Sequence, residues 1–188
     1  IRLVLPQADR ALTLILHFEL FCFLVYYCQM SNTRCITIGG SSGAGKGVLA
    51  GAIQETLAHE LGHEKVALYD TGATYRFAIL LALESGAANE EEVVGFARTL
   101  IQANDPLGFL EQFQDLWDNP ERHHELRSQQ ISGLVAKVGW LDEAQYYFTN
   151  ILNHRVSFGA ASGIHAAIVD SRTPEVLLLP SIRAHIIK

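Results

Sequence analysis

The segment CITIGGSSGAGKGVLAGAIQETLAHEL, Cys35–Leu61, carries the spacing Gly40-x-x-x-x-Gly45-Lys46 between a β-type run and a helical pattern. A glycine-rich loop that follows a strand and opens a helix is typical of a phosphate-binding loop. Its glycines let backbone N–H groups turn inward, the helix N-terminus adds partial positive charge, and the lysine reaches the outer phosphates. A flexible loop before an ordinary helix is the alternative, but it does not account for the lysine. The segment therefore predicts an α/β fold that binds a polyanion.

The position after the lysine departs from the usual pattern of such loops. It normally holds Ser or Thr, whose hydroxyl binds Mg²⁺. Here it is Gly47, and Val48 follows, so neither neighbour supplies a hydroxyl. The sequence leaves open which group replaces it.

Outward from this loop, the chain from Met30 onward alternates short apolar runs with longer amphipathic ones, which is typical of a parallel sheet covered by helices. We expect strands at Cys35–Gly39, Val66–Tyr69, Ala166–Val169 and His185–Lys188, with a weaker candidate at Val176–Leu179. We expect helices near Gly45–His59, Ala73–Ser85, Glu90–Gln102, Leu126–Lys137 and Leu141–Arg155. The span Asp105–Arg127 loses clear periodicity and contains two prolines, so it is predicted to be an insertion or small lobe.

Composition narrows the classes of function. The 188 residues and 20.7 kDa fit one domain, and the 49% hydrophobic content supplies a sizeable core. A net charge of −6 and a pI near 5.7 argue against a nucleic-acid binder, but they allow a local cationic pocket for a small phosphorylated ligand. The three cysteines include no C-x-x-C pair. Neither a disulfide framework nor a thiolate zinc site is indicated, and a reducing cytoplasm is expected.

Residues 1–29 need a separate interpretation, because Ala11–Cys28 is a nearly continuous apolar run. A membrane anchor is one alternative, but His17 and Glu19 lie near the middle of the run, where a charge is costly in lipid. A packed accessory helix is another. Met30 is the only methionine. We therefore expect the native domain to span residues 30–188, with residues 1–29 arising from upstream translation or a fusion.

The HELGH stretch that begins at His59 matches the zinc-peptidase signature H-E-x-x-H. That site needs both histidines on one helical face, whereas Gly62 is expected to end the helix as a left-handed C-cap and to leave His63 outside it. We therefore expect no metal site here. His123–His124 are expected to be solvated, and His154–Arg155 to form a basic helix terminus.

Four landmarks in the same order resemble those of the bacterial cytidylate kinases, P-loop nucleoside monophosphate kinases that phosphorylate CMP and dCMP. They are GGSSGAGKG, YDTGATYR, ELRSQQIS and AIVDSRTPEVLLLPSIRAHIIK. The match runs from Met30 to Lys188. The resemblance implies a three-layer α/β/α P-loop kinase fold with a parallel sheet and a small substrate lobe at residues 105–130. We also expect a cytoplasmic monomer that binds neither nucleic acid nor membrane.

The resemblance also implies the site residues. ATP, with Mg²⁺, is expected at Ser42, Gly43, Ala44, Gly45, Lys46, Gly47 and Val48. CMP or dCMP is expected at Thr71, Tyr75, Arg76, Asp170 and Arg172, with Tyr75 lining the nucleoside pocket and both arginines facing phosphates. Lys46 and Arg172 are the expected catalytic residues, since permanent cations suit a transferring phosphoryl group. Tyr75 as a core residue, and the arginines as surface ion-pair residues, remain alternatives.

Departures from the family pattern support further alternatives. Ala136 and Gln145 stand where the family has a serine and an arginine that contact CMP, and Thr173 replaces an aspartate. The arginine-bearing lid is expected after Lys188, and losing such arginines can cost about 10³–10⁵ in rate. The leading hypothesis is a CMP/dCMP kinase. The alternatives are a non-catalytic or truncated nucleotide binder, another small P-loop kinase and, disfavoured, a zinc peptidase.

Overall fold

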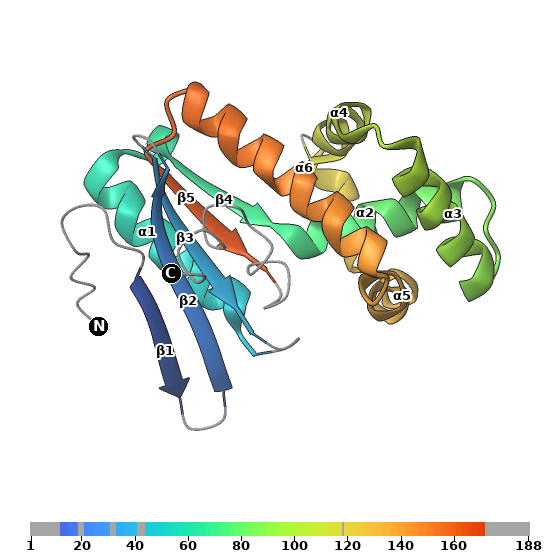
Figure 1. Ribbon diagram of the computed structural model, residues 1–188, viewed down its shortest axis with the longest axis horizontal. Helices are drawn as coiled ribbons and strands as arrows, with labels where there is room; N and C mark the ends of the chain where they lie inside the picture. Colours follow the sequence, from blue (N-terminus) through green and yellow to red (C-terminus); the bar gives the residue numbers. More distant parts are fainter. Residues whose placement is uncertain (1–11, 19–20, 31–32, 41–43, 118, 172–188) are drawn as a thin grey trace. The chain divides into compact units, whose positions relative to one another are not determined.

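The computed structural model describes residues 12–18, 21–30, 33–40, 44–117 and 119–171 (Figure 1). These residues fall into two compact units. Unit 1 holds the described residues up to Asp70 and those from Arg155 onward, and unit 2 is Thr71–His154. Each unit has its own buried apolar cluster, and each is described by itself.

Unit 1 is built on a sheet whose described strands run in the order β1-β2-β3-β5-β4. β3, β5 and β4 are parallel, and the registers Ile38↔Asp170 and Asp70↔Asp170 bring their carboxyl ends to one edge. The strands are β1 (Leu12–Phe18), β2 (Phe21–Met30), β3 (Thr33–Gly39), β4 (Val66–Asp70) and β5 (Ala166–Asp170). The three parallel strands confirm the predictions for those segments. The strands expected at Val176–Leu179 and His185–Lys188 lie outside the described residues.

The apolar run before Met30 forms strands rather than a helix. β1 pairs antiparallel with β2, and β2 pairs antiparallel with β3 from Leu24↔Gly39 to Met30↔Thr33. The alternative of a packed accessory helix is therefore wrong for this run, and two antiparallel strands extend the expected parallel sheet. Periodicity alone does not separate a buried strand from a buried helix, and the aromatic and β-branched residues of FCFLVYYCQM favour a strand. Among the residues that the structure describes, no helix is long and apolar enough to cross a membrane.

Helix α1 (Lys46–Leu61) covers one face of the parallel strands. Its Ile53 lies in the same buried cluster as Ile36 of β3 and Ile168 of β5. Because side chains alternate between the two faces of a strand, every second residue of these strands points towards α1. The helix was predicted at Gly45–His59, so its position is confirmed with a small shift at each end.

The last turns of α6 (Asp142–Ala161) belong to unit 1 and contact Tyr69 of β4. Tyr69 of β4 makes its contacts with Arg155 of this helix. With α1 packed on one face of the parallel strands and the end of α6 against Tyr69, which points to the other face, unit 1 has the α/β organisation that the sequence predicted.

Unit 2 is helical in its described part. It contains α2 (Thr71–Glu84), α3 (Glu90–Ala103), α4 (Pro106–Trp117), the 3-10 turns η2 (Pro120–Arg122) and η3 (Glu125–Arg127), α5 (Gln129–Gly139) and the start of α6. The helices expected near Ala73–Ser85, Glu90–Gln102, Leu126–Lys137 and Leu141–Arg155 are confirmed as elements. The end predicted for the last of them is wrong, because α6 continues to Ala161.

The span Asp105–Arg127 contains a helix that the periodicity analysis missed. In α4, Phe109, Phe113 and Leu116 are buried at helical spacing. Pro106 is the first helical residue, a position where proline is tolerated, and the Asp105 carboxylate accepts a hydrogen bond from the Gly108 N–H (2.9 Å). The proline that suggested irregular structure is therefore a helix start signal.

Aromatic rings fill the core of unit 2. Phe77 of α2 meets Phe109 and Phe113 of α4 with ring centroids 5.2 and 5.5 Å apart, edge to face. Phe148 of α6 lies 5.7 Å from Phe109 and 4.2 Å from Tyr75. Such rings bury large areas and gain from edge-to-face geometry.

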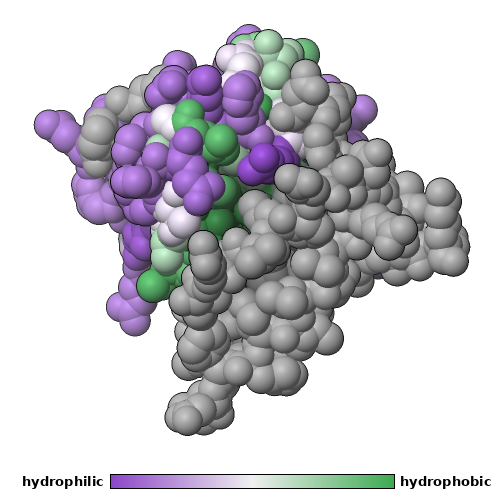
Figure 2. Space-filling model, turned by 90° about the vertical axis from the view of Figure 1, so that its left-hand side faces the viewer, coloured by the Kyte–Doolittle hydropathy of each residue, from purple (hydrophilic) through white to green (hydrophobic). Residues whose placement is uncertain are grey.

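On the face drawn in Figure 2, the coloured residues are mostly hydrophilic around a smaller hydrophobic area.

Candidate active site

The glycine-rich loop joins β3 to α1 through a backbone conformation that requires glycine. Gly45 has φ 84° and ψ 14°, in the left-handed region, and α1 begins at Lys46. Gly45 offers no side-chain cap, and the first turn of α1 contains no acidic residue. The first N–H groups of α1 and the partial positive charge of its N-terminus therefore suit an anion. Ser42 and Gly43 lie outside the described residues.

The side chains at the start of α1 differ in exposure. Ala44 is buried and Lys46 is half-buried, whereas Val48 is 80% exposed. An exposed valine contributes little to the core, and it provides no hydroxyl for a cation. Neither Gly47 nor Val48 therefore supplies a side-chain hydroxyl at the start of α1.

Asp170, at the carboxyl end of β5, lies against the first turn of α1. Its Oδ2 is 3.4 Å from the position that a Cβ on Gly47 would occupy. The Ser171 N–H donates to the carbonyl oxygen of Ile38 (3.0 Å), which ties the end of β5 to the end of β3. Gly47 thus leaves room for a carboxylate beside the lysine-bearing helix.

Asp70 ends β4 in the same rung as Asp170. Leu68 and Ile168, two residues earlier on each strand, both belong to the cluster around α1. By the alternation of side chains, Asp70 and Asp170 follow them onto the face that α1 covers. Unit 1 therefore gathers a glycine-rich loop, a lysine and carboxylates at the carboxyl edge of its parallel strands, which is where α/β proteins bind ligands.

The predicted acceptor residues of unit 2 lie on the first turns of α2, directly after Asp70 in the chain. Thr71 is buried, and its carbonyl oxygen accepts a hydrogen bond from Thr74 Oγ1 (2.6 Å). Tyr75 is 1% exposed and packs on Phe148, so its ring has the burial expected of a core residue. Arg76, one position on, is half-buried. Whether these side chains bind CMP stays a prediction, and Arg172 lies outside the described residues.

Two departures from the family pattern fall on described residues of unit 2. Ala136 is exposed on α5, and Gln145 on α6 donates from Nε2 to the carbonyl oxygen of Gly139 (3.3 Å). Neither side chain brings a cation. Thr173, the third departure, lies outside the described residues.

The zinc-peptidase geometry is not formed. α1 ends at Leu61, and His63 begins the 3-10 turn η1 (His63–Lys65), so His59 and His63 do not share a helix. Gly62 has the positive φ expected (100°), but its ψ of 141° differs from the predicted left-handed cap. Over residues 12–18, 21–30, 33–40, 44–117 and 119–171, no cluster of three or more potential ligands could hold a metal ion.

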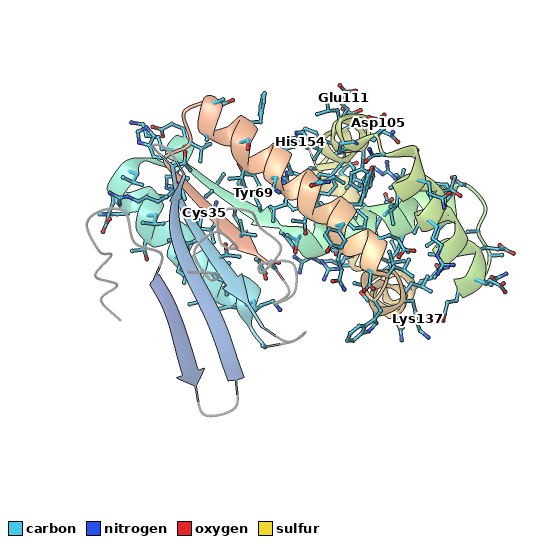
Figure 3. All side chains as sticks on the ribbon, in the orientation of Figure 1. Cys35, Tyr69, Asp105, Glu111, Lys137 and His154 are labelled. Atoms are coloured by element: carbon cyan, nitrogen blue, oxygen red, sulfur yellow. The ribbon has the colours of Figure 1, made fainter. Side chains whose placement is uncertain are left out.

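Sequence reasoning missed Arg155. It was predicted at a basic helix terminus, but it lies inside α6, and its Cζ is 5.0 Å from the ring centroid of Tyr69. Tyr69 Oη donates to the carbonyl oxygen of Arg155 (3.3 Å). Burial lowers the pKa of Arg155, while Tyr69 and Asp70 act in the opposite sense. Figure 3 shows Tyr69 on β4 beside α6.

Comparison with known proteins supports the resemblance. The chain is 30% identical to the cytidylate kinase of Pasteurella multocida over 155 residues, which cover 81% of this chain and 61% of the relative. It is 30% identical to that of Vibrio parahaemolyticus over 162 residues, covering 83% and 63%. A shorter match to the Haemophilus ducreyi cytidylate kinase is 46% identical over 61 residues, covering 32% and 24%. The chain thus spans about three fifths of the first two relatives.

No family model matches the chain, and no solved structure matches it significantly. The similarity to the Pasteurella and Vibrio enzymes nevertheless covers about four fifths of this chain, and the strand, glycine-rich loop and helix of unit 1 have the α/β organisation of a P-loop kinase. The chain is therefore a relative of the bacterial cytidylate kinases, as its four motifs predicted.

Proposed function

We propose that this chain transfers the γ-phosphoryl group of ATP to CMP or dCMP, giving CDP or dCDP. The observation that carries the proposal is the phosphate end of unit 1: Gly45 in the left-handed conformation, Lys46 at the start of α1 and the Asp170 carboxylate against Gly47. The proposal takes the nucleotide specificity from the relatives that are named cytidylate kinases. Phosphoryl transfer needs positioning and charge stabilisation rather than a covalent intermediate, and this site offers both.

The donor side of the reaction uses unit 1. The glycine-rich loop and the first turn of α1 hold the phosphates of ATP, and Lys46 stabilises negative charge on the outer ones. The site fits Mg²⁺ through the carboxylate of Asp170, because Mg²⁺ prefers oxygen ligands and Gly47 and Val48 offer none from their side chains. Bound Mg²⁺ would neutralise charge on the β- and γ-phosphates.

The acceptor side uses the start of α2 and the segment after β5. Arg76 and Arg172 bind the phosphate of CMP through their guanidinium groups, which suit phosphate geometry. Thr71, Tyr75 and Asp170 complete the acceptor site by the family pattern. The acceptor pocket itself is the part of the proposal that rests most on resemblance.

A non-catalytic nucleotide binder is the second candidate. Ala136 and Gln145 stand where the family has a serine and an arginine that contact CMP, and neither Gly47 nor Val48 offers a hydroxyl. Such a protein would bind ATP at the loop of unit 1 and would not turn it over. A third possibility is a P-loop kinase with another acceptor.

We further propose that residues 30–188 carry the kinase domain, with residues 105–130 as part of the substrate lobe, and that it works as a cytoplasmic monomer without nucleic-acid partners. The antiparallel pairing of β2 with β3 gives residues 24–30 a structural role in unit 1 to be tested. A chain of residues 30–188 should keep ATP affinity if the extension lies outside the functional domain. Loss of that affinity would reject the domain boundary.

The decisive experiment is an assay of ADP release by the full 188-residue chain with CMP, dCMP, UMP and AMP as acceptors. We expect turnover with CMP and dCMP that depends on Mg²⁺. ATP binding by calorimetry without turnover at any Mg²⁺ concentration would select the non-catalytic binder. Turnover with AMP alone would select another P-loop kinase, and absence of ATP binding would reject all three.

A further inference from the structure

Arg155 and Tyr69 make a built contact in unit 1 that the proposed chemistry does not use. Tyr69 is 7% exposed, and the half-buried Arg155 guanidinium lies over its ring, with Cζ 5.0 Å from the centroid. The Tyr69 hydroxyl also donates to the backbone carbonyl of Arg155 (3.3 Å). One arginine therefore holds the tyrosine ring through its side chain and the hydroxyl through its main chain.

Gly159, one turn after Arg155 on α6, makes room for the same tyrosine. A Cβ at Gly159 would lie 2.3 Å from Tyr69 Oη, a separation that side chains do not tolerate. Any other residue there would displace the hydroxyl. Arg155 and Gly159 thus form a contact site for the tyrosine on one face of α6, called the Tyr69 contact site below.

Tyr69 is the last residue before the chain reaches Asp70 and enters α2 at Thr71. Its backbone pairs with Val169 of β5. Its side chain is held by the Tyr69 contact site, on the side of the strand away from the α1 cluster. A residue held both by the sheet and by its side chain has little freedom to twist. The conformation of Tyr69, one residue before the end of β4, is therefore held in part by Arg155.

We propose that Arg155 is a positioning residue for the acceptor nucleotide: through Tyr69 it fixes the β4–α2 junction, Asp70–Thr71, from which the CMP-binding side chains of α2 start. This inference rests on the proposed function. It predicts that Arg155 acts on CMP and not on ATP, because the glycine-rich loop leaves β3 and not β4. Small displacements of positioning groups are costly, and about 1 Å can cost 10²-fold in rate.

The test compares Arg155→Met, Arg155→Lys and Tyr69→Phe with the wild type and with Arg98→Met. Arg98 pairs with Glu143 (3.3 Å), both side chains being about half exposed, and serves as a control for loss of an arginine. For Arg155→Met we expect CMP affinity by calorimetry to fall about tenfold while ATP affinity stays within about twofold. Arg155→Lys should recover part of the loss, since a lysine retains a cation over the ring. Arg98→Met should change neither affinity.

Hydrogen exchange of the nucleotide-free protein tests the positioning itself. Amides of residues 69–74 should exchange about tenfold faster in Arg155→Met, while those of α1 stay as in the wild type. Tyr69→Phe keeps the ring and removes only the hydroxyl, so it should fold and show a smaller change in the same amides. If the wild type binds no CMP, the proposed function fails, and the exchange experiment still decides whether Arg155 fixes the junction. Unchanged exchange at residues 69–74, or equal loss of ATP and CMP affinity, would overturn the inference.

Discussion

The candidate site of unit 1 depends mainly on the main chain, whereas that of unit 2 depends on side chains. In unit 1 the phosphate end depends largely on the main chain: Gly45 adopts φ 84°, and α1 begins there without a side-chain cap. In unit 2 the predicted acceptor residues act through side chains, such as the guanidinium of Arg76. A main-chain site tolerates substitutions that leave the backbone unchanged, whereas a side-chain site loses its group with the residue. This difference explains how Gly47 and Val48 can stand in a loop that otherwise keeps its pattern.

The cores of the two units also differ, in the kind of side chain that fills them. The cluster around α1 is aliphatic and includes Ile36, Ile38 and Ile168, whereas unit 2 is held by aromatic rings. Parallel strands favour β-branched residues that pack in layers, and helices that cross at varied angles leave spaces that rings fill. Substitutions in the two units should therefore affect different measurements.

The largest effect is expected from Phe113→Ala in unit 2. Phe113 is 1% exposed and contacts Phe77 and Trp117, each with ring centroids 5.5 Å apart. Truncating a buried phenylalanine costs about 3–5 kcal/mol, which should lower the melting temperature by roughly ten degrees. Phe158→Ala, at a 76% exposed position of unit 1, is the matched control and should be nearly neutral. Equal melting of the two variants would contradict the aromatic core.

Lys46→Ala should next separate phosphate binding from stability. Removing a cation from the outer phosphates should lower turnover by about 10²-fold or more, with little change in melting temperature. Lys137→Ala is the control, because Lys137 pairs with Glu90 (3.0 Å) and both side chains are about half exposed. Assays of ATP affinity and turnover for the two variants decide the point. Full activity in Lys46→Ala would exclude the loop as the ATP site.

Arg76→Met should show the opposite selectivity to Lys46→Ala. If Arg76 binds the acceptor phosphate, KM for CMP should rise about tenfold or more while ATP affinity stays within about twofold. Steady-state kinetics with each substrate varied in turn provide the measurement. An equal loss for both substrates would show that Arg76 supports the fold of α2 rather than the acceptor, and the division between the two units would fail.

Local patterns predicted the parts of the fold that local physics determines. Short apolar runs gave β3, β4 and β5 because buried parallel strands read as continuous apolar segments, and the glycine spacing gave the start of α1. α4 was missed because Pro106 was read as a breaker, although it occupies the first helical position. β1 and β2 were missed because an apolar run of that length fits a helix as well as a strand pair.

Contacts between distant segments were beyond the sequence. Nothing local marks Tyr69 as the partner of Arg155 or explains Gly159, since the three residues meet only when α6 packs on β4. The prediction that Arg155 lies at a helix end failed for this reason: α6 continues to Ala161, and the guanidinium of Arg155 packs over the Tyr69 ring. The proximity of Asp170 to Gly47 likewise depends on the register of β5 beside β3.

Val48→Thr should have a smaller effect that tests the missing hydroxyl. Val48 is 80% exposed, so the substitution should leave the melting temperature within about a degree. If the loop lacks a magnesium ligand, a threonine there should raise turnover at low Mg²⁺ by a few-fold and leave it unchanged at saturating Mg²⁺. Val48→Ala controls for the loss of the valine methyl groups. An identical Mg²⁺ dependence in the wild type and in Val48→Thr would mean that the site does not need this hydroxyl.

The smallest effect is a pH dependence that differs between a tyrosine of each unit. Burial, together with the charge of Asp105, raises the pKa of Tyr147 to about 12. The Tyr147 hydroxyl donates a hydrogen bond to the carbonyl oxygen of Asp105 (3.2 Å). In the unfolded chain the pKa of a tyrosine is about 10. Between pH values of about 10 and 12 the unfolded state therefore loses a proton that the folded state keeps. Stability from Tyr147 is thus complete below pH of about 10 and falls as the pH rises through this window.

Tyr69 should contribute less to that pH dependence. Burial raises its pKa too, but the cation of Arg155 lowers it and offsets part of the rise. In urea unfolding at pH 9, 10 and 11, Tyr147→Phe should flatten the decline in the free energy of unfolding more than Tyr69→Phe does. Both variants also lose a hydrogen bond, which lowers stability by a similar amount at every pH and leaves the slope unaffected. A steeper pH dependence from Tyr69 than from Tyr147 would mean that the cation of Arg155 does not lower the pKa of Tyr69. That result would weaken the case for the Tyr69 contact site.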